Sequence, residues 1–184
     1  MKNIIAGIAG AMIVFIWGGI SWMILPWHNW GLKSFQEEGQ TVTLAIKKEA
    51  LESGIYILPN ISPDMHENKE KEKAWMERAH QGPFAFMSVK TEGTRSSMVP
   101  GLLIQFLIEL MVAFIGVWLI NKCTHPHHWQ KALFVSYAVG AGAFVMNFSD
   151  WNWWGFPLTV ALVNTVDAAI AWFLGGFIMA KILK

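Results

Sequence analysis

Four polar side chains inside two long apolar runs are the residues of this sequence best placed to do chemistry. Gln105 and Glu109 are four residues apart, and Asn164 and Asp167 are three residues apart. In a helix, each pair lies on one face. A charged side chain at the centre of a membrane-spanning helix costs about 2.5–3.5 kcal/mol on insertion scales. Such a residue persists where it is shielded, paired or used.

The two acids of this set are expected at matching depths. Glu109 follows Pro100 by nine residues, and Asp167 follows Pro157 by ten. At 1.5 Å per residue, both lie about 14–15 Å from the same membrane surface. We therefore expect the four polar side chains to face one another inside a helix bundle, as a proton or cation relay or a substrate-contacting site. The favoured alternative is that they only hydrogen-bond helices together, at about 0.6 kcal/mol per bond.

A second cluster combines a thiol with three imidazoles. Cys123, His125, His127 and His128 place four potential ligands within six residues. Thiolate and imidazole ligands suit Zn²⁺ or copper, so these residues are a candidate metal site. The spacing matches no zinc-finger pattern, and Pro126 limits how far the ligands can converge. A solvated loop without metal is the favoured interpretation, and we predict no cofactor.

Tryptophans gather where the apolar runs begin and end, as expected of amphipathic rings at a membrane–water interface. His28 lies among the first group, and we interpret it as an interfacial residue rather than a haem or metal ligand. The second group is interpreted as a membrane anchor, with a lipid-binding or partner-binding rim as the alternative. The predicted interfacial residues are Trp27, His28, Trp30, Trp151, Trp153 and Trp154.

Composition indicates a small membrane protein with several spans. Of 184 residues, 54% are hydrophobic and 15% are charged, which is unusual for a soluble domain. The formal net charge of +1 supplies no field that would attract nucleic acid. We therefore expect a lipid bilayer as the partner of this chain, and we do not expect it to bind nucleic acid. The single cysteine excludes an intrachain disulfide.

The elements that must position these residues are four helices. We predict an all-α membrane bundle of four helices with a small extramembrane α+β insertion between the first and second. Residues 1–25 form the first helix, an uncleaved anchor, and residues 26–99 form the insertion. Residues 100–184 hold the other helices, at about 100–120, 132–148 and 157–183, with a loop at 121–131.

The insertion carries most of the charged residues of the chain. Apolar periodicity predicts a helix within 35–51, and alternating Lys and Glu predict a solvated helix at 65–80. Short strands are predicted at 55–58 and 84–89. Two strands and two helices make a thin core, so the insertion is expected to need the membrane surface or a partner for stability.

The lysines outside the insertion predict the orientation. If four helices alternate, all five of these lysines lie on one side, and the opposite short loop carries Asp150 without a basic residue. The positive-inside rule then places both termini and loop 121–131 in the cytoplasm and residues 26–99 in the periplasm. The five are Lys2, Lys122, Lys131, Lys181 and Lys184.

Several stretches together carry a resemblance. They are FIWGGISWMILPWHN near the N-terminus, GIYILPN, GPFAFMSV, and WNWWGFPLTVALVNTVDAAIAWFLGGFIMAK near the C-terminus. With them the chain resembles a group of uncharacterised bacterial integral membrane proteins. The resemblance implies a bacterial inner membrane and a similar layout. It implies no activity, cofactor or catalytic residue.

The expected function is that of an integral inner-membrane protein without evident enzymatic activity. It would serve as an accessory or scaffold subunit of a membrane assembly, as a homo- or hetero-oligomer. The alternative is a small proton- or cation-coupled carrier or channel that uses Glu109 and Asp167. An enzyme that acts on lipid is the third possibility, with His28 and Asp150 as its only candidate groups near the interface.

Overall fold

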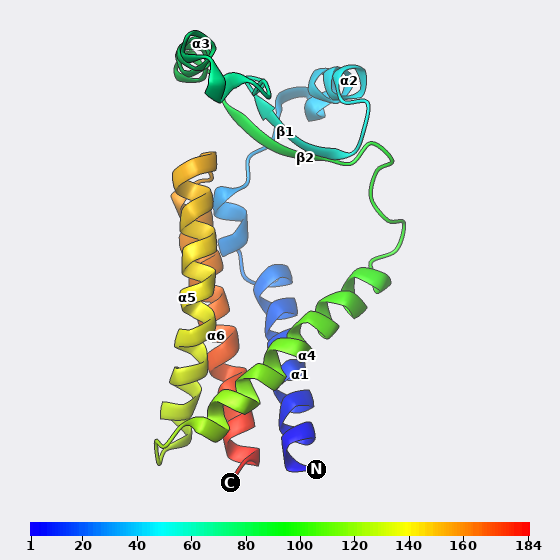
Figure 1. Ribbon diagram of the computed structural model, residues 1–184. Coiled ribbons are helices and arrows are strands. Elements are labelled where there is room, and N and C mark those ends of the chain that lie inside the picture. The colour runs from blue at the N-terminus through cyan, green and yellow to red at the C-terminus, as the bar shows by residue number, and fades with distance from the viewer. The chain divides into compact units, whose positions relative to one another are not determined.

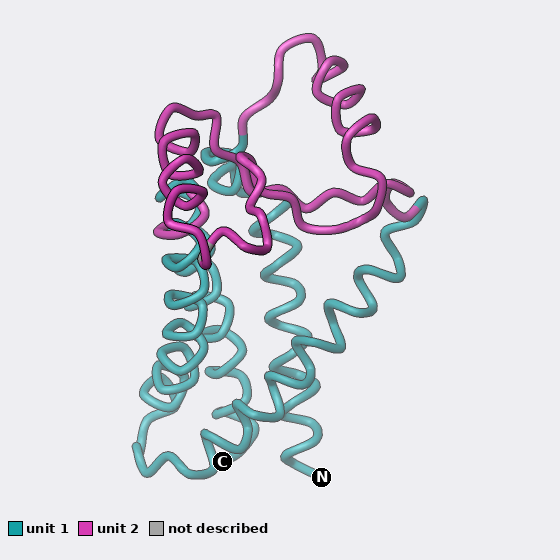
Figure 2. The backbone as a smooth tube through the Cα atoms, turned by 45° about the horizontal axis from the view of Figure 1, so that its top comes forward, with its two compact units in different colours: residues 1–32, 96–151, 156–184 teal, residues 33–95, 152–155 magenta. Residues whose placement is uncertain are grey.

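The computed structural model describes residues 1–184, except for the side chain of His66. The chain is mostly helical and forms two compact units (Figure 2). The helical unit comprises residues 1–32, 96–151 and 156–184, and the second unit comprises residues 33–95 and 152–155. The main helices and strands, labelled in Figure 1, are α1 (Lys2–Met23), α2 (Gln40–Glu49), β1 (Gly54–Leu58), α3 (Lys69–Gln81), β2 (Ala85–Val89), α4 (Val99–Lys122), α5 (His128–Trp154) and α6 (Leu158–Ile182). Three short 3-10 turns are η1 (Trp27–Gly31), η2 (Gln36–Gly39) and η3 (Met65–Glu67).

Within the described chain, α1, α4, α5 and α6 are the four helices long and apolar enough to cross a membrane. They contain 22, 24, 27 and 25 residues, and about 20 apolar residues suffice for one crossing. This confirms the prediction of four long apolar helices. Proline stands within the first turn of α4 and directly before α6, where its missing N–H costs no helical hydrogen bond.

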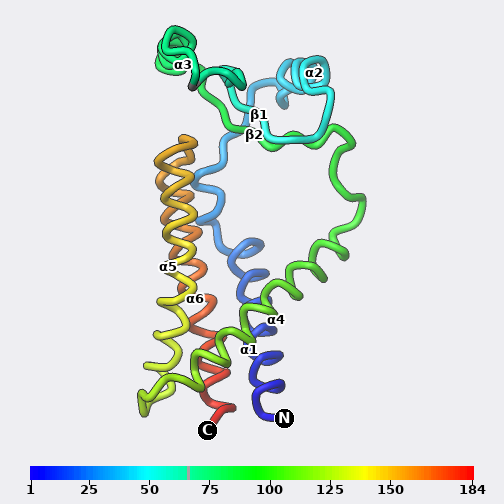
Figure 3. Tube along the Cα trace, in the orientation of Figure 1, coloured from blue at the N-terminus to red at the C-terminus, as the bar shows by residue number. Residues whose placement is uncertain are grey.

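Helix α1 packs against both α4 and α6 through small residues. A Cβ added to Gly175 of α6 would lie 2.8 Å from Val14 Cγ2 and 3.2 Å from the carbonyl oxygen of Gly10. Since real Cβ contacts are longer, the two backbones approach too closely there for any larger residue. Ala6 and Ala113 are fully buried in the same core. In Figure 3, α4 crosses α1 obliquely, and its N-terminal half runs away from both α1 and α6.

Helix α5 packs along α6 through a stripe of small residues. Ser136 Oγ donates a hydrogen bond of 2.7 Å to the carbonyl oxygen of Ala169. Gly176 of α6 lies against the backbone of Ala132, whose Cα would be 3.1 Å from an added Cβ. Gly140 continues the stripe, with Ala169 as its neighbour. The four-residue spacing of Ala132, Ser136 and Gly140 therefore forms one helix contact.

Both chain termini lie at one end of the helical unit (Figure 1). Lys2 Nζ donates a hydrogen bond of 3.0 Å to the carbonyl oxygen of Lys184. Asn121 Nδ2, near the end of α4, donates to Asn3 Oδ1 at 3.4 Å. The start of α1 and the end of α6 therefore lie together at one end of the helical unit.

The second unit contains a small antiparallel sheet. Strands β1 and β2 pair in the register Gly54↔Val89 to Leu58↔Ala85, close to the predicted strands. Helix α3 begins one turn later than predicted because Asn68 caps it: its Oδ1 accepts from the N–H groups of Glu70 and Lys71 at 3.0 and 3.2 Å.

Two other elements differ from the sequence prediction in their bounds. The helix expected within 35–51 spans only Gln40–Glu49, because Glu37, Glu38 and Gly39 all have positive φ and interrupt the chain before it. Helix α5 was expected at 132–148 but extends from His128 to Trp154. It ends just before Gly155, whose φ of 73° favours glycine.

Candidate functional site in the helical unit

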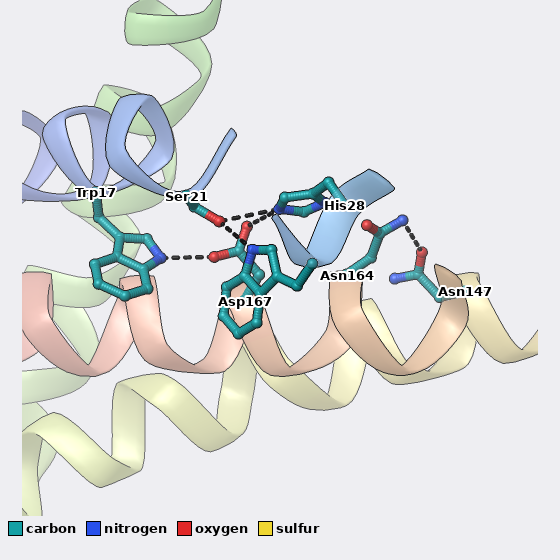
Figure 4. A network of polar contacts seen from close by, with 7 residues as sticks. Trp17, Ser21, His28, Asn147, Asn164 and Asp167 are labelled. Atoms are coloured by element: carbon teal, nitrogen blue, oxygen red, sulfur yellow. Dashed lines mark hydrogen bonds and ion pairs between the residues drawn. The ribbon is translucent and has the colours of Figure 1, made fainter. Parts of the chain in front are cut away.

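Asp167, near the middle of α6, is the centre of a network of polar side chains (Figure 4). Its Oδ1 accepts a hydrogen bond of 2.6 Å from Trp17 Nε1 of α1. Its Oδ2 lies 3.3 Å from Nε2 of His28, which belongs to η1. The two side chains of this pair are only 13% and 5% exposed, respectively. One carboxylate of α6 therefore contacts both α1 and η1, which lie far from α6 in the sequence.

His28 is held from several sides. Ser21 Oγ lies 3.0 Å from the same Nε2 atom, and Trp27 Nε1 donates to Ser21 Oγ at 3.0 Å. The ring of Trp22 stacks on the imidazole, with centroids 3.9 Å apart and an interplanar angle of 9°. Each of these polar groups therefore has a partner, and none is buried unpaired. Such a network fixes the position of the His28 ring.

The local sequence explains how His28 reaches α6. Pro26 follows the end of α1, and Trp27–Gly31 forms a 3-10 turn that returns the chain toward the bundle. Gly31 packs so closely on α6 that an added Cβ would lie 2.1 Å from Val160 Cγ2. Only glycine fits this approach. The turn therefore belongs to the helical unit, although the sequence assigned residues 26–99 to the insertion.

The geometry of this network does not correspond to a relay for a nucleophilic serine. In a Ser-His-Asp triad, the serine and the carboxylate contact opposite nitrogens of the imidazole. Here Ser21 and Asp167 both approach Nε2 of His28. Asp167 therefore cannot orient the ring for proton removal from Ser21. The arrangement suits the fastening of α1 and η1 to α6.

The four polar residues predicted to face one another all line one cavity between α1, α4 and α6. The cavity measures about 740 Å³. Direct hydrogen bonds follow another pattern: Gln105 Nε2 donates to Glu109 Oε1 at 3.0 Å, and Asn164 Nδ2 donates to Asn147 Oδ1 of α5 at 3.2 Å. Among the described contacts, none joins Glu109 directly to Asp167. The α4 pair and the α6 pair share a cavity, and Asp167 is tied to α1 and η1.

No protein-family model, curated protein sequence or solved structure matches this chain. The resemblance to bacterial integral membrane proteins therefore stays an expectation. Function must be inferred from the cavity, the side chains around it and the surfaces of the helices.

Glu109 is the least satisfied group of the cavity. The residue is 8% exposed, and its Oε1 accepts from Gln105. Its Oε2 is buried without a hydrogen-bond partner among the described residues. A buried acceptor without a partner costs about 1–3 kcal/mol, and more when it is charged. This atom is therefore the point of the cavity where a bound group would gain most.

The sequence patterns did not predict that His28, Trp17, Ser21 and Asn147 belong to the site. His28 was assigned to the interface because it follows a proline and stands between tryptophans, a pattern typical of a span end. The usable signal was the short distance in sequence between Ser21 and His28, since seven residues with a turn at Pro26 allow the chain to fold back.

The cysteine and histidines of loop 121–131 are not brought together. Cys123 is a free, half-buried thiol. His125 and His127 are exposed, and the ring of His127 stacks near Trp129, with centroids 6.4 Å apart. Among the described residues, no group of three or more His, Cys, Asp or Glu side chains is arranged to hold a metal ion.

The predicted interfacial tryptophans divide into two kinds. Trp27 turns inward and donates to Ser21. Trp30 and Trp153 are 61% and 72% exposed. Trp151 and Trp154 are also exposed, and Trp154 stacks on Phe86 within the second unit, with centroids 4.6 Å apart. Their placement at a membrane surface stays a prediction.

Proposed function

We propose that this chain is a non-enzymatic integral membrane protein that acts as an accessory or scaffold subunit of a membrane assembly. The observation that supports this proposal most is the exposure of the outer face of α5. In an apolar 18-residue stretch of α5, only 17% of the residues are buried inside the structure, compared with 33% in the corresponding stretch of α1. Ala138 and Gly142 are both exposed and lie four residues apart, and nothing lies within 4 Å of a Cβ added to Gly142.

An open small-residue face of this kind fits a neighbouring helix. In lipid, helices associate where small residues allow close backbone approach, and apolar surface alone gives no driving force. The stripe that α5 uses toward α6 shows how this sequence builds such contacts, through Ser136 and Gly140. The outer pair offers the same geometry to another helix, from a second copy or from a different protein.

The proposal includes a location in the bacterial inner membrane. Lys2 and Lys184 meet at one end of the helical unit, and the end of α4, with Lys122, lies close to α1 there. The positive-inside rule supports a cytoplasmic position for this end. Residues 26–99 would then be periplasmic.

We expect the substitution Gly142→Leu to dissociate the assembly. The added side chain would occupy the space in which a partner backbone packs, and overpacking of such a contact typically costs about 1–3 kcal/mol. The full-length protein is purified from the membrane in mild detergent, and the mass of its assembly is measured by native mass spectrometry. Gly101→Leu is the matched control, since Gly101 is equally open. A monomeric parent protein, or equal effects of both variants, would overturn the subunit proposal.

The second candidate is a small proton- or cation-coupled carrier or channel, favoured by the unpartnered Oε2 of Glu109 beside the cavity. We expect Glu109→Gln to abolish flux in liposomes that hold the full-length protein, because the amide cannot exchange a proton or neutralise a cation. A pH-sensitive dye inside the liposomes reports the flux, with Asp150→Asn as the control. Flux that survives Glu109→Gln, or no flux in the parent protein, would remove this candidate.

A further inference from the structure

The cavity between α1, α4 and α6 has the size and lining of a ligand site. Its volume of about 740 Å³ falls within the range of about 300–1,000 Å³ typical of small-molecule pockets. Most of its lining residues are apolar, among them Val14, Phe15, Leu102 and Ala171. The lining also includes a few polar side chains, and such groups fix the orientation of a ligand in small-molecule sites.

The charges of the lining favour a cation. Glu109 and Asp167 contribute carboxylates, and the lining includes neither lysine nor arginine. Asp167 is already engaged by Trp17 and His28. Glu109 is not, because its Oε2 has no partner within the described chain. An ionised carboxylate buried without a cation carries a large desolvation cost, which a bound positive charge would offset.

The position of Glu109 allows this pairing. The residue is more than nine-tenths buried and lines the cavity, so the surrounding helices cover most of its side chain. Rotation about the last side-chain torsion of a glutamate has broad energy wells. Either oxygen can therefore turn toward the cavity while the other keeps the hydrogen bond from Gln105.

The aromatic lining distinguishes an organic cation from a metal ion. Trp17 and Trp22 both line the cavity, and indole faces attract ammonium-type cations. A hard metal ion needs several oxygen ligands. Among the described residues, no group of three or more acidic, histidine or cysteine side chains is arranged to provide them.

We propose that this cavity binds a hydrophobic organic cation, with Glu109 as its counter-ion and Trp22 as an aromatic wall. The proposal goes beyond the scaffold function and does not depend on the carrier candidate, with which it shares only Glu109. Binding requires no transport. The apolar lining accepts the substituents of the cation, and the carboxylate accepts its charge.

The test uses two ions of nearly equal shape and opposite charge, tetraphenylphosphonium and tetraphenylborate. Their binding to the full-length protein in phosphatidylcholine nanodiscs is measured by equilibrium dialysis, with empty nanodiscs to subtract uptake by lipid. We expect saturable binding of the phosphonium only. Glu109→Gln should weaken it by at least about tenfold, as loss of a hydrogen-bonded or paired charge does. Asp150→Asn should leave it within about twofold of the parent protein.

A second variant protects the test against a folding defect in Glu109→Gln. Trp22 is 62% exposed, so Trp22→Leu removes its stacking contact with His28 but no buried side chain. It should weaken phosphonium binding several-fold. Equal binding of both ions, or full binding by Glu109→Gln, would overturn the proposal. Phosphonium binding without proton or cation flux would support it while removing the carrier candidate, and flux without phosphonium binding would do the reverse.

Discussion

Substitution of Asp167 by alanine is expected to lower the free energy of unfolding by about 2–3 kcal/mol. The reason is that two groups lose one shared partner: the N–H of half-buried Trp17, whose Nε1 lies at 2.6 Å, and buried His28, whose Nε2 lies at 3.3 Å. Hydrogen bonds between membrane helices average only about 0.6 kcal/mol. This site should exceed that average, because its loss removes two contacts at once: the Trp17 indole N–H loses its acceptor, and His28 keeps only its contact with Ser21.

The measurement is unfolding of the full-length protein by sodium dodecyl sulfate in mixed micelles, followed by far-ultraviolet circular dichroism. Asp167→Asn, which keeps one oxygen acceptor but loses the charge, should fall between the alanine variant and the parent. Asp150→Ala is the control, since Asp150 lies outside the network. An Asp167→Ala protein as stable as the Asp150→Ala protein would show that the network contributes nothing to the bundle.

The second large effect is expected at the crossing of α1 and α6. Gly175→Leu should destabilise the helical unit by about 3 kcal/mol. Its Cβ alone would lie 2.8 Å from Val14 Cγ2 and 3.2 Å from the carbonyl oxygen of Gly10. Val14 is stiff because it is branched at Cβ, and the Gly10 oxygen belongs to the backbone. Relief therefore requires α1 to move away from α6.

Gly18→Leu is the matched control for this crossing. Gly18 belongs to α1, and nothing lies within 4 Å of a Cβ added there. The same change should therefore alter stability by less than about 1 kcal/mol, in part through the better helix propensity of leucine. Equal losses in both variants, measured by the same unfolding experiment, would contradict the packing of α1 on α6.

The fold was largely predictable because length and hydropathy determine membrane-type helices almost by themselves. The runs that begin near Ile4 and Pro100 became α1 and α4 within a few residues. The end of α5 was missed because aromatic and polar residues were interpreted as a headgroup loop. The backbone there has no helix-breaking residue before Gly155, so the helix continues to Trp154.

The site was predictable only in part. In the structure Gln105 donates to Glu109, one helical turn away, and both acids line one cavity. Depth does not determine rotation about the helix axis, however, so it could not show that Asp167 would contact Trp17. The part played by His28 depends on the turn at Pro26 and on the close approach of Gly31 to Val160. Both are tertiary features that periodicity does not encode.

The coupling free energy between His28 and Asp167 tests the central claim, that η1 is fastened to α6 through this buried pair. It is obtained from the unfolding free energies of His28→Ala, Asp167→Ala, the double variant and the parent protein. Residues in direct contact typically couple by about 0.5–3 kcal/mol. We expect at least about 1 kcal/mol for this pair. Losses that simply add, with a coupling below about 0.3 kcal/mol, would show that the two side chains do not meet.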